Sequence, residues 1–191
     1  MGYSMKNRKK IAVLFSGQGT NFAHIMKTLH NKEYEIVFAL SNKPDAGGIA
    51  IAQEYGIAYG VVEPHHFDSR ETYDEVLVST LKHYEPDLTV LAGFMRILTP
   101  MFTEQIKAIN LHPSLLPRHK GLKAIEKSYE DSHAEGGVSI HYVSSQLDAG
   151  EIIVQKSLVK EGLSFEKYDK AIRSLEKESL IEAIHTVLKD K

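Results

Sequence analysis

The stretch IAVLFSGQGTN, residues 11–21, predicts a strand, a tight turn and the start of a helix in direct succession. Residues 11–16 form a short apolar run of the kind found in strands that are buried on both faces of a parallel sheet. Two glycines then let the backbone bend tightly, and apolar residues through Ile25 and Leu29 continue at helical spacing. A strand that leads directly into a helix indicates an α/β protein.

The alternation of strands and helices continues along the chain. Predicted strands cover residues 35–41, 57–62, 87–93 and 107–112. The helices predicted between them cover residues 49–56, closed by Gly56, and residues 68–84, capped by Asp68 or Ser69. This order predicts right-handed βαβ units, and therefore a mostly parallel, Rossmann-like sheet with helices on both faces.

The last part of the chain has a different pattern. Residues 136–145 alternate between apolar and polar side chains, and residues 150–159 form another expected strand. Ser164 is the expected cap of a long amphipathic helix, whose apolar positions are Tyr168, Ile172, Leu175, Ile184 and Leu188. We therefore predict an antiparallel C-terminal portion, in one domain that spans residues 10–191 after an N-terminal extension of residues 1–9.

The composition excludes several classes of protein. The chain has 191 residues and a formal net charge of −2, so a general attraction to nucleic acid or to acidic membranes is not expected. The absence of cysteine excludes disulfides, zinc–thiolate sites and cysteine nucleophiles. No apolar run approaches the roughly 18 residues of a membrane span. The lack of cysteine is compatible with a reducing compartment.

Four polar motifs follow predicted strands. They are GQGTN (17–21), NKPD (42–45), GFMRIL (93–98) and NLHPS (110–114). Ligands of open α/β sheets bind beyond the carboxyl ends of the strands, so these motifs are expected to lie close together in space.

The first motif is a candidate phosphate site. Its glycines allow a tight turn, and a helix that starts at Thr20 and Asn21 would present backbone N–H groups that attract phosphate. Phe22 stands where a full dinucleotide fingerprint has its last glycine, and the lysine of a P-loop is missing. The alternative is a plain turn in which Thr20 or Asn21 caps the helix.

The segment INLHPSLLPRHKG, residues 109–121, is a candidate catalytic segment. Asn110 and His112 are two residues apart on a strand, so both side chains point to the same face. They could supply a hydrogen-bond donor and a general acid or base, or they could form a structural polar pair. Pro113 and Pro117 favour a rigid loop, and Leu116–Pro117 is a candidate cis bond.

Asp148 lies in a predicted turn between two strands. It is either an ordinary turn residue or a carboxylate that orients His112.

Other polar residues carry weaker signals. His65 and His66 lie in an expected loop with only Glu63 and Asp68 as neighbouring carboxylates, so we do not expect a metal site. Without a G-x-S-x-G elbow, Ser114 is a poor candidate for a hydrolase nucleophile. Arg70, near a helix start, could bind a carboxylate or could simply be solvated.

Taken together and in this order, these segments resemble the folate-dependent formyltransferases, and among them the phosphoribosylglycinamide formyltransferases. The resemblance covers the chain from about Lys10 to the last helix. Besides the motifs above, it rests on DSRETYDE, on LAGFMRILTP and on GVSIHYVSSQLDAGEIIVQ. It implies transfer of the formyl group of 10-formyltetrahydrofolate to the amine of 5′-phosphoribosylglycinamide, without a metal and without a covalent intermediate. Asn110, His112 and Asp148 would be its catalytic residues.

The resemblance also implies two groups of binding residues. The residues that would bind the glycinamide ribonucleotide are Gly19, Thr20, Asn21 and Glu176. The residues that would bind 10-formyltetrahydrofolate are Arg70, Met95, Arg96, Ile97, Leu98 and Asn110.

The chain departs from the family pattern at four positions. Thr20 replaces a common serine, and Lys123 and Ile125 stand where the family often has histidine. Lys177 follows Glu176 where histidine is common.

Three alternatives remain to be weighed. Methionyl-tRNA formyltransferase has the same core with a further RNA-binding domain and a basic surface, neither of which we expect here. Formyltetrahydrofolate hydrolase adds an N-terminal domain, whereas about 9 residues precede the first predicted strand and a domain needs roughly 50. It stays the enzyme alternative, because water can replace the amine. The third alternative is a catalytically silent binding module on the same fold.

Overall fold

The computed structural model describes residues 8–189. The predicted extension, residues 1–9, therefore lies almost entirely outside the described residues. The chain divides into two compact units, and the boundary between them in the sequence lies between Ala108 and Ile109.

The N-terminal unit contains four parallel strands. They are β1 (Lys9–Phe15), β2 (Tyr34–Ser41), β3 (Ala58–Val61) and β4 (Leu88–Leu91). Their order in the sheet is β3-β2-β1-β4, with parallel pairing at each step. The chain thus moves from β1 toward one edge of the sheet and then returns past β1 to β4, which makes β1 a central strand.

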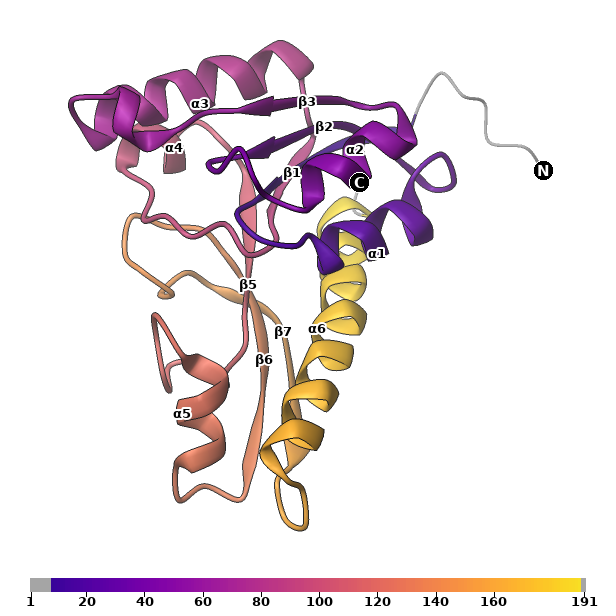
Figure 1. Cartoon of the computed structure of the whole chain (residues 1–191), viewed down its shortest axis with the longest axis vertical. Coiled ribbons are helices and arrows are strands. Elements are labelled where there is room, and N and C mark those ends of the chain that lie inside the picture. Colours follow the sequence, from indigo (N-terminus) through magenta and orange to yellow (C-terminus); the bar gives the residue numbers. More distant parts are fainter. Residues whose placement is uncertain (1–7, 190–191) are drawn as a thin grey trace. The chain divides into compact units, whose positions relative to one another are not determined.

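This strand order decides where the helices lie. The connecting helices are α1 (Thr20–Leu29), α2 (Gly48–Tyr55) and α3 (Arg70–Tyr84). Right-handed crossovers that move in one direction put α1 and α2 on one face of the sheet, and the reversed crossover puts α3 on the other. Figure 1 shows this arrangement.

The core of this unit follows from the apolar run that predicted the fold. Ile11 to Phe15 are buried on both faces of the sheet, as expected for a central parallel strand. Phe15 stacks on Phe22 of α1 with ring centroids 5.2 Å apart. On the other face, Phe38 of β2 stacks on Tyr84 of α3 at 4.1 Å. Helices on both faces are therefore tied to the sheet by aromatic contacts.

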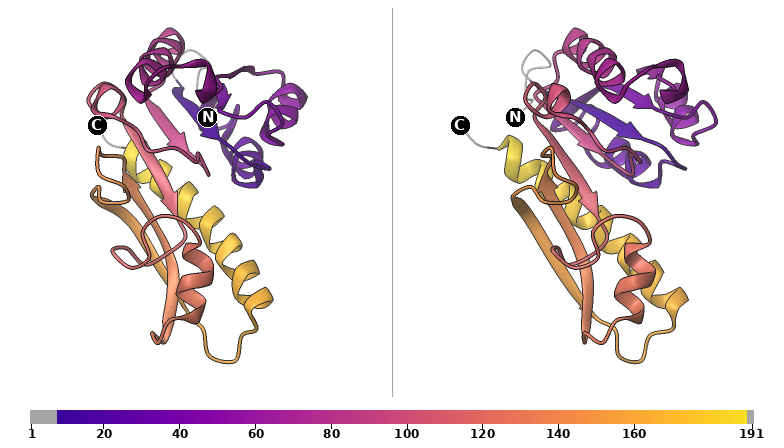
Figure 2. Two further views of the ribbon diagram at one scale, coloured as in Figure 1. Left: turned by 60° about the vertical axis from the view of Figure 1, so that its left-hand side comes forward. Right: turned by 90° about the vertical axis from the view of Figure 1, so that its left-hand side faces the viewer.

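The C-terminal unit is antiparallel, as predicted. Its strands are β5 (Ala108–His112), β6 (Glu135–Tyr142) and β7 (Ile152–Val159), and β6 pairs with both neighbours. The register places Asn110 opposite His141 and His112 opposite Ser139. The strands and the long helix α6 (Phe165–Leu188) can be followed in Figure 2.

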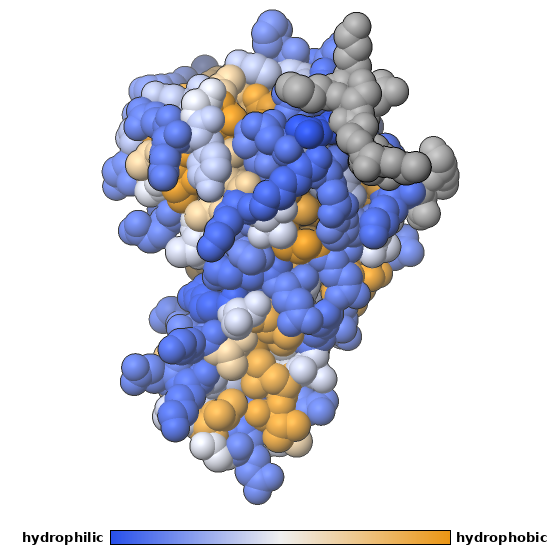
Figure 3. All heavy atoms as spheres, turned by 90° about the vertical axis from the view of Figure 1, so that its right-hand side faces the viewer, coloured by the Kyte–Doolittle hydropathy of each residue, from blue (hydrophilic) through white to orange (hydrophobic). Residues whose placement is uncertain are grey.

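Helix α6 begins where the sequence predicts. The Ser164 side chain accepts a hydrogen bond from the backbone N–H of Lys167 and caps the helix. Four of the predicted apolar positions are buried, whereas Leu175 is partly exposed and the neighbouring Glu176 is buried. Hydrophobic side chains also reach the surface of this unit (Figure 3), and Val159 and Phe165 are among the exposed ones.

Three short elements are not predicted from the sequence. They are the 3₁₀ turn η2 (Pro64–His66) and the helices α4 (Pro100–Thr103) and α5 (Ala124–Glu130). Each is too short for an apolar period to become visible. Among residues 8–189, no helix combines the length and the apolar character needed to cross a membrane.

Candidate active site

The carboxyl ends of β1, β2 and β4 meet at Ser16. Its backbone N–H donates to the Gly93 carbonyl at 3.0 Å, and its hydroxyl donates to Asn42 Oδ1 at 2.6 Å. The same hydroxyl accepts from the backbone N–H of Met95 at 2.8 Å. The motifs that follow these three strands are therefore neighbours, as predicted. The fourth motif belongs to the C-terminal unit.

The candidate phosphate loop requires its glycine. Gly19 has a left-handed backbone with φ of 78°, and a Cβ there would lie 2.7 Å from the Cα atom of Gly48. Helix α1 begins at the next residue, Thr20, and no side chain caps it. The alternative in which Thr20 or Asn21 is the cap is therefore wrong. The first N–H groups of an α-helix have no acceptor within the helix, so a helix start without a side-chain cap is suited to an anion.

The predicted folate segment, residues 95–98, contains two exposed residues and two residues that pack against the rest of the N-terminal unit. Met95 and Ile97 are exposed, and Leu98 is buried. The guanidinium carbon of Arg96 lies 3.8 Å from the centroid of the Tyr73 ring, as in a cation–π contact.

Asp74 holds the far end of the same segment. Its Oδ2 atom accepts hydrogen bonds from both the backbone N–H and the hydroxyl of Thr99, each at 2.7 Å. Its other oxygen lies 3.9 Å from Arg96 Nε. Burial raises the pKa of Tyr73 to about 12, although the charge of Arg96 acts in the opposite direction. The segment is thus fixed in shape by α3.

Arg70 is the first residue of α3 and is exposed. Ser69, one of the two predicted caps, is the actual one, and it forms a capping box with Thr72. The exposed guanidinium is therefore carried on a well-defined helix start.

In the C-terminal unit, Asn110 and His112 point to the same face of β5 and both approach Asp148. Asp148 Oδ1 lies 3.4 Å from Asn110 Nδ2, and Asp148 Oδ2 lies 3.4 Å from His112 Nδ1. His112 and Asp148 are buried. The structure thus brings Asp148, which the sequence left in a separate segment, to the strand face that carries Asn110 and His112.

Both ring nitrogens of His112 face acceptors. Nδ1 faces the Asp148 carboxylate, and Nε2 donates to the backbone carbonyl of His119 at 2.8 Å. A carbonyl and a carboxylate can only accept, so the doubly protonated ring satisfies both contacts. This geometry favours His112 as a proton donor.

Asp148 is held by its backbone and by its partners. It adopts a left-handed backbone with φ of 48°, and its Oδ2 atom accepts the Gly121 N–H at 2.9 Å. Burial alone would raise the pKa of Asp148. Hydrogen bonds from His141 and Gly121, together with the nearby charge of His112, instead hold that pKa below its ordinary value. The carboxylate therefore stays ionised beside His112.

His141 belongs to the same cluster, and the sequence interpretation missed it. Its Nε2 atom lies 3.2 Å from Asn110 Nδ2 and 3.5 Å from Asp148 Oδ1. Its Nδ1 donates to the Tyr142 carbonyl at 2.9 Å, and the ring is buried. The signal available was the alternation in residues 136–145, which puts His141 on the polar face of its strand. The register with Asn110 was not available from the sequence.

The loop after β5 contains Pro113 and Pro117 of the candidate catalytic segment. Leu116–Pro117 is cis, as the sequence suggested. The Ser114 hydroxyl donates to the Arg118 carbonyl, so this serine stabilises a turn.

Lys123 and Ile125, which stand where the family often has histidine, contribute to the local structure of the chain around α5. Lys123 has a left-handed backbone at the start of α5, and Ile125 is buried. Neither side chain is part of the Asp148 cluster.

Glu176 is the remaining predicted site residue. It is buried in the middle of α6, and its Oε1 atom lies 3.5 Å from Arg173 Nη1 one turn earlier.

The comparisons with known proteins agree with this geometry. Residues 9–184 match the family model described as formyl transferase. The chain is 40% identical to phosphoribosylglycinamide formyltransferase of Escherichia coli over 149 residues, which are 76% of this chain and 70% of that protein. It is 39% identical to the Haemophilus influenzae enzyme over 151 residues, 77% of this chain and 71% of that protein.

A solved structure extends the likeness to the fold. The crystal structure of phosphoribosylglycinamide formyltransferase from Campylobacter jejuni has a TM-score of 0.91 and 49% sequence identity, and the match covers 93% of this chain and 96% of that one. The predicted fold class, a mostly parallel α/β sheet with an antiparallel C-terminal portion, is thereby confirmed. The chain belongs to the formyl transferase family, among the phosphoribosylglycinamide formyltransferases.

Proposed function

We propose that the protein transfers the formyl group of 10-formyltetrahydrofolate to the amine of 5′-phosphoribosylglycinamide. The products are formylglycinamide ribonucleotide and tetrahydrofolate, in de novo purine biosynthesis. The observation that carries the proposal is the approach of Asn110 and His112 to one buried carboxylate, Asp148. Family membership supports formyl transfer as the reaction in which this set of groups would act.

The first step forms a bond between the substrate amine and the formyl carbon. The electron pair of the carbonyl then moves onto its oxygen, and this oxyanion needs fixed hydrogen-bond donors. In our proposal, the Asn110 amide and the protonated His112 ring donate to it. The present contact of His112 Nε2 with the His119 carbonyl would be exchanged for a contact with the substrate.

The second step breaks the bond between the formyl carbon and N10 of the folate. The attacking nitrogen must lose a proton and N10 must gain one, so a positioned acid and base is required. His112 would carry this proton, directly or through a water molecule. Asp148 would orient the His112 ring and keep the proton of that ring available. It can do so because the pKa of Asp148 is lowered and the carboxylate stays negatively charged.

The binding residues form two proposed groups. Gly19, Thr20 and Asn21 would bind the substrate phosphate through the N-terminal N–H groups of α1, and Glu176 would contact the ribose hydroxyls. The proposed folate contacts are Arg70 at the glutamate tail, Met95, Arg96, Ile97 and Leu98 around the pterin, and Asn110 at the formyl group.

The proposal includes the biological setting expected from the sequence. The formyltransferase domain would span residues 10–191, as a cytoplasmic monomer or homodimer. Its partners would be the two small-molecule substrates, without nucleic acid or membrane, and the transfer itself would use no metal ion.

The first test measures the tetrahydrofolate released from 10-formyltetrahydrofolate by absorbance, with and without 5′-phosphoribosylglycinamide. We expect release only when the glycinamide substrate is present. Equal release in its absence would replace the transferase by a formyltetrahydrofolate hydrolase. No release under either condition would favour a silent binding module.

A second prediction concerns the phosphate. Glycinamide riboside, which lacks the phosphate, is expected to have a KM at least about tenfold higher than that of the ribonucleotide. The reason is that a hydrogen bond to a charged group contributes about 1.5–3 kcal/mol, and about 1.4 kcal/mol corresponds to a factor of ten. The KM for the folate serves as the control and should stay unchanged. Equal KM values for riboside and ribonucleotide would remove the phosphate site from the proposal.

A further inference from the structure

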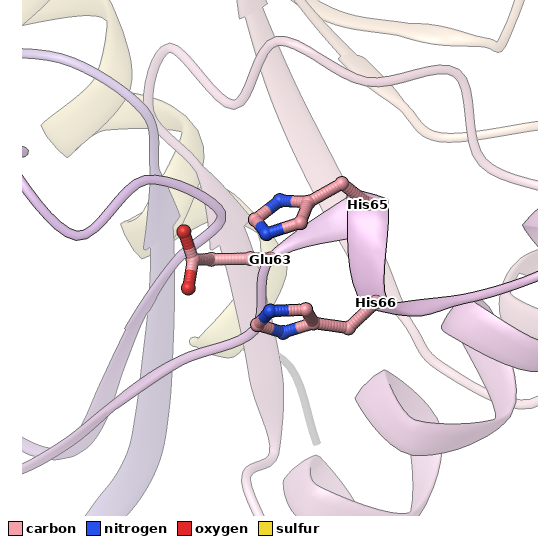
Figure 4. A group of neighbouring side chains, drawn as sticks. All are labelled: Glu63, His65 and His66. Carbon is pink, nitrogen blue, oxygen red and sulfur yellow. The ribbon is translucent and has the colours of Figure 1, made fainter.

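Three potential metal ligands converge in the turn that joins β3 to α3. Glu63, His65 and His66 each offer a ligand atom, and these atoms all lie within 4.8 Å of one another. Figure 4 shows the carboxylate and the two imidazole rings gathered on the same side of the turn. The sequence does not predict this site, because Glu63 and Asp68 are the only carboxylates near the two histidines in the chain.

The backbone explains why the side chains gather. Pro64 occupies the first position of the 3₁₀ turn and fixes its backbone there. The His66 N–H donates to the Glu63 carbonyl at 3.2 Å, and the Phe67 N–H donates to the Pro64 carbonyl at 3.1 Å. This tight winding brings the two imidazole rings to a centroid separation of 4.1 Å.

The turn is fastened to the core at both ends by Tyr73. The buried Tyr73 hydroxyl donates to the Val62 carbonyl at 2.8 Å, just before the turn. The ring of Phe67, just after the turn, meets the Tyr73 ring edge-on at 5.2 Å. The Val62 N–H also bonds to the Ser41 carbonyl at 2.9 Å. Fixed ends reduce the entropy that is lost when the three ligands close on an ion.

The types of the three ligand atoms indicate which metal ions the site would bind. Two imidazole nitrogens and one carboxylate oxygen are a known ligand set for Zn²⁺, and imidazole also suits other late divalent transition metals. His65 and His66 are exposed and Glu63 is partly exposed, so an ion could enter from solvent and water would complete its coordination. We infer that Glu63, His65 and His66 form a binding site for Zn²⁺ or a related divalent transition metal.

Isothermal titration of the untagged, full-length protein with Zn²⁺ alone tests this inference. We expect a site with a stoichiometry of one ion per chain. The double substitution His65→Ala with His66→Ala should weaken binding at least about tenfold, since even loss of an outer-shell partner costs 10–100-fold in metal affinity. Glu63→Gln should weaken it in the same direction, because it removes the anionic ligand without changing the size of the side chain.

The controls separate this site from weak surface binding by the other histidines of the chain, which has 10 histidines including His65 and His66. His83→Ala removes an exposed histidine on α3 that is not in the cluster, and it should leave the Zn²⁺ affinity unchanged. Formyl transfer by the double variant should equal that of the unmodified protein, which also shows that the variant is folded. Unchanged Zn²⁺ affinity in the double variant or in Glu63→Gln, or no Zn²⁺ binding by the unmodified protein, would overturn the inference.

Discussion

Replacing His112 by alanine is expected to lower kcat by a factor on the order of 10² to 10⁴. In the proposed reaction, His112 both donates to the oxyanion and carries the proton from the amine to the folate nitrogen. Alanine can do neither, and the binding residues proposed for the two substrates are not changed. The KM values should therefore change much less than kcat, as is found when an interaction made only in the transition state is removed. Steady-state kinetics with each substrate varied in turn measures both quantities.

His83→Ala is the matched control, because this histidine is exposed on α3 and has no role in the proposal. It should keep the full kcat. A His112→Ala protein with nearly normal turnover would exclude His112 as the acid and base. A circular dichroism spectrum like that of the unmodified protein would exclude unfolding as the cause of a lost rate.

Replacing Asp148 by asparagine is expected to lower kcat by at least about 10², as in other enzymes where a carboxylate that orients a histidine becomes an amide. Asparagine keeps the size of the side chain, and its oxygen can still accept the Gly121 N–H. What is lost is the negative charge 3.4 Å from His112 Nδ1. The kcat should fall with little change in either KM. The pH dependence of kcat should also shift, because the partner of His112 is then neutral. The dependence of kcat on pH is the readout that a purely structural role would not alter.

Asp87→Asn is the control for this variant. Asp87 is an exposed aspartate that also accepts a backbone hydrogen bond, from Lys10 at 2.7 Å. Its replacement removes the same charge away from the cluster and should leave kcat unchanged. Full activity of Asp148→Asn would show that the carboxylate only shapes the turn.

The lowered pKa of Asp148 also makes a contribution to stability that depends on pH. The unfolded chain has an ordinary aspartate pKa of about 3.9, and the folded pKa is lower. The ionised carboxylate therefore stabilises the fold above that unfolded value, and this contribution is lost as the pH falls through the folded pKa. Urea unfolding should show that the difference in stability between the unmodified protein and Asp148→Asn shrinks below about pH 4.

The sequence predicts the regular elements well, because each has a clear periodic signal. The buried run at residues 11–16 predicts β1, Gly56 predicts the end of α2, and Ser164 predicts the start of α6. The boundaries of the predicted elements differ from the structure by up to three residues, the largest difference being at the end of β6, predicted at residue 145 and found at Tyr142. The turn η2 and the helices α4 and α5 have too few residues for a period, and local prolines and tertiary contacts decide them.

The candidate site is predicted in part. Two residues on one strand face, Asn110 and His112, follow from the alternation of side chains alone. The meeting of both with Asp148 depends on the return of β6 and on the turn before β7, which no local pattern contains. His141 was missed for the same reason, since its place beside Asn110 comes from the strand register. The role of Ser16, which joins the ends of three strands, has no local signal either.

The left-handed backbone of Asp148 limits which residues can be tolerated at this position. Glycine, asparagine and aspartate adopt this conformation far more readily than other residues do. Among these three, only aspartate carries a charge. Aspartate and asparagine codons differ by a single base, so one mutation can silence the proposed chemistry while the turn keeps its shape. A protein with this mutation would be folded but inactive, and measurements of its abundance or thermal stability would not detect the loss.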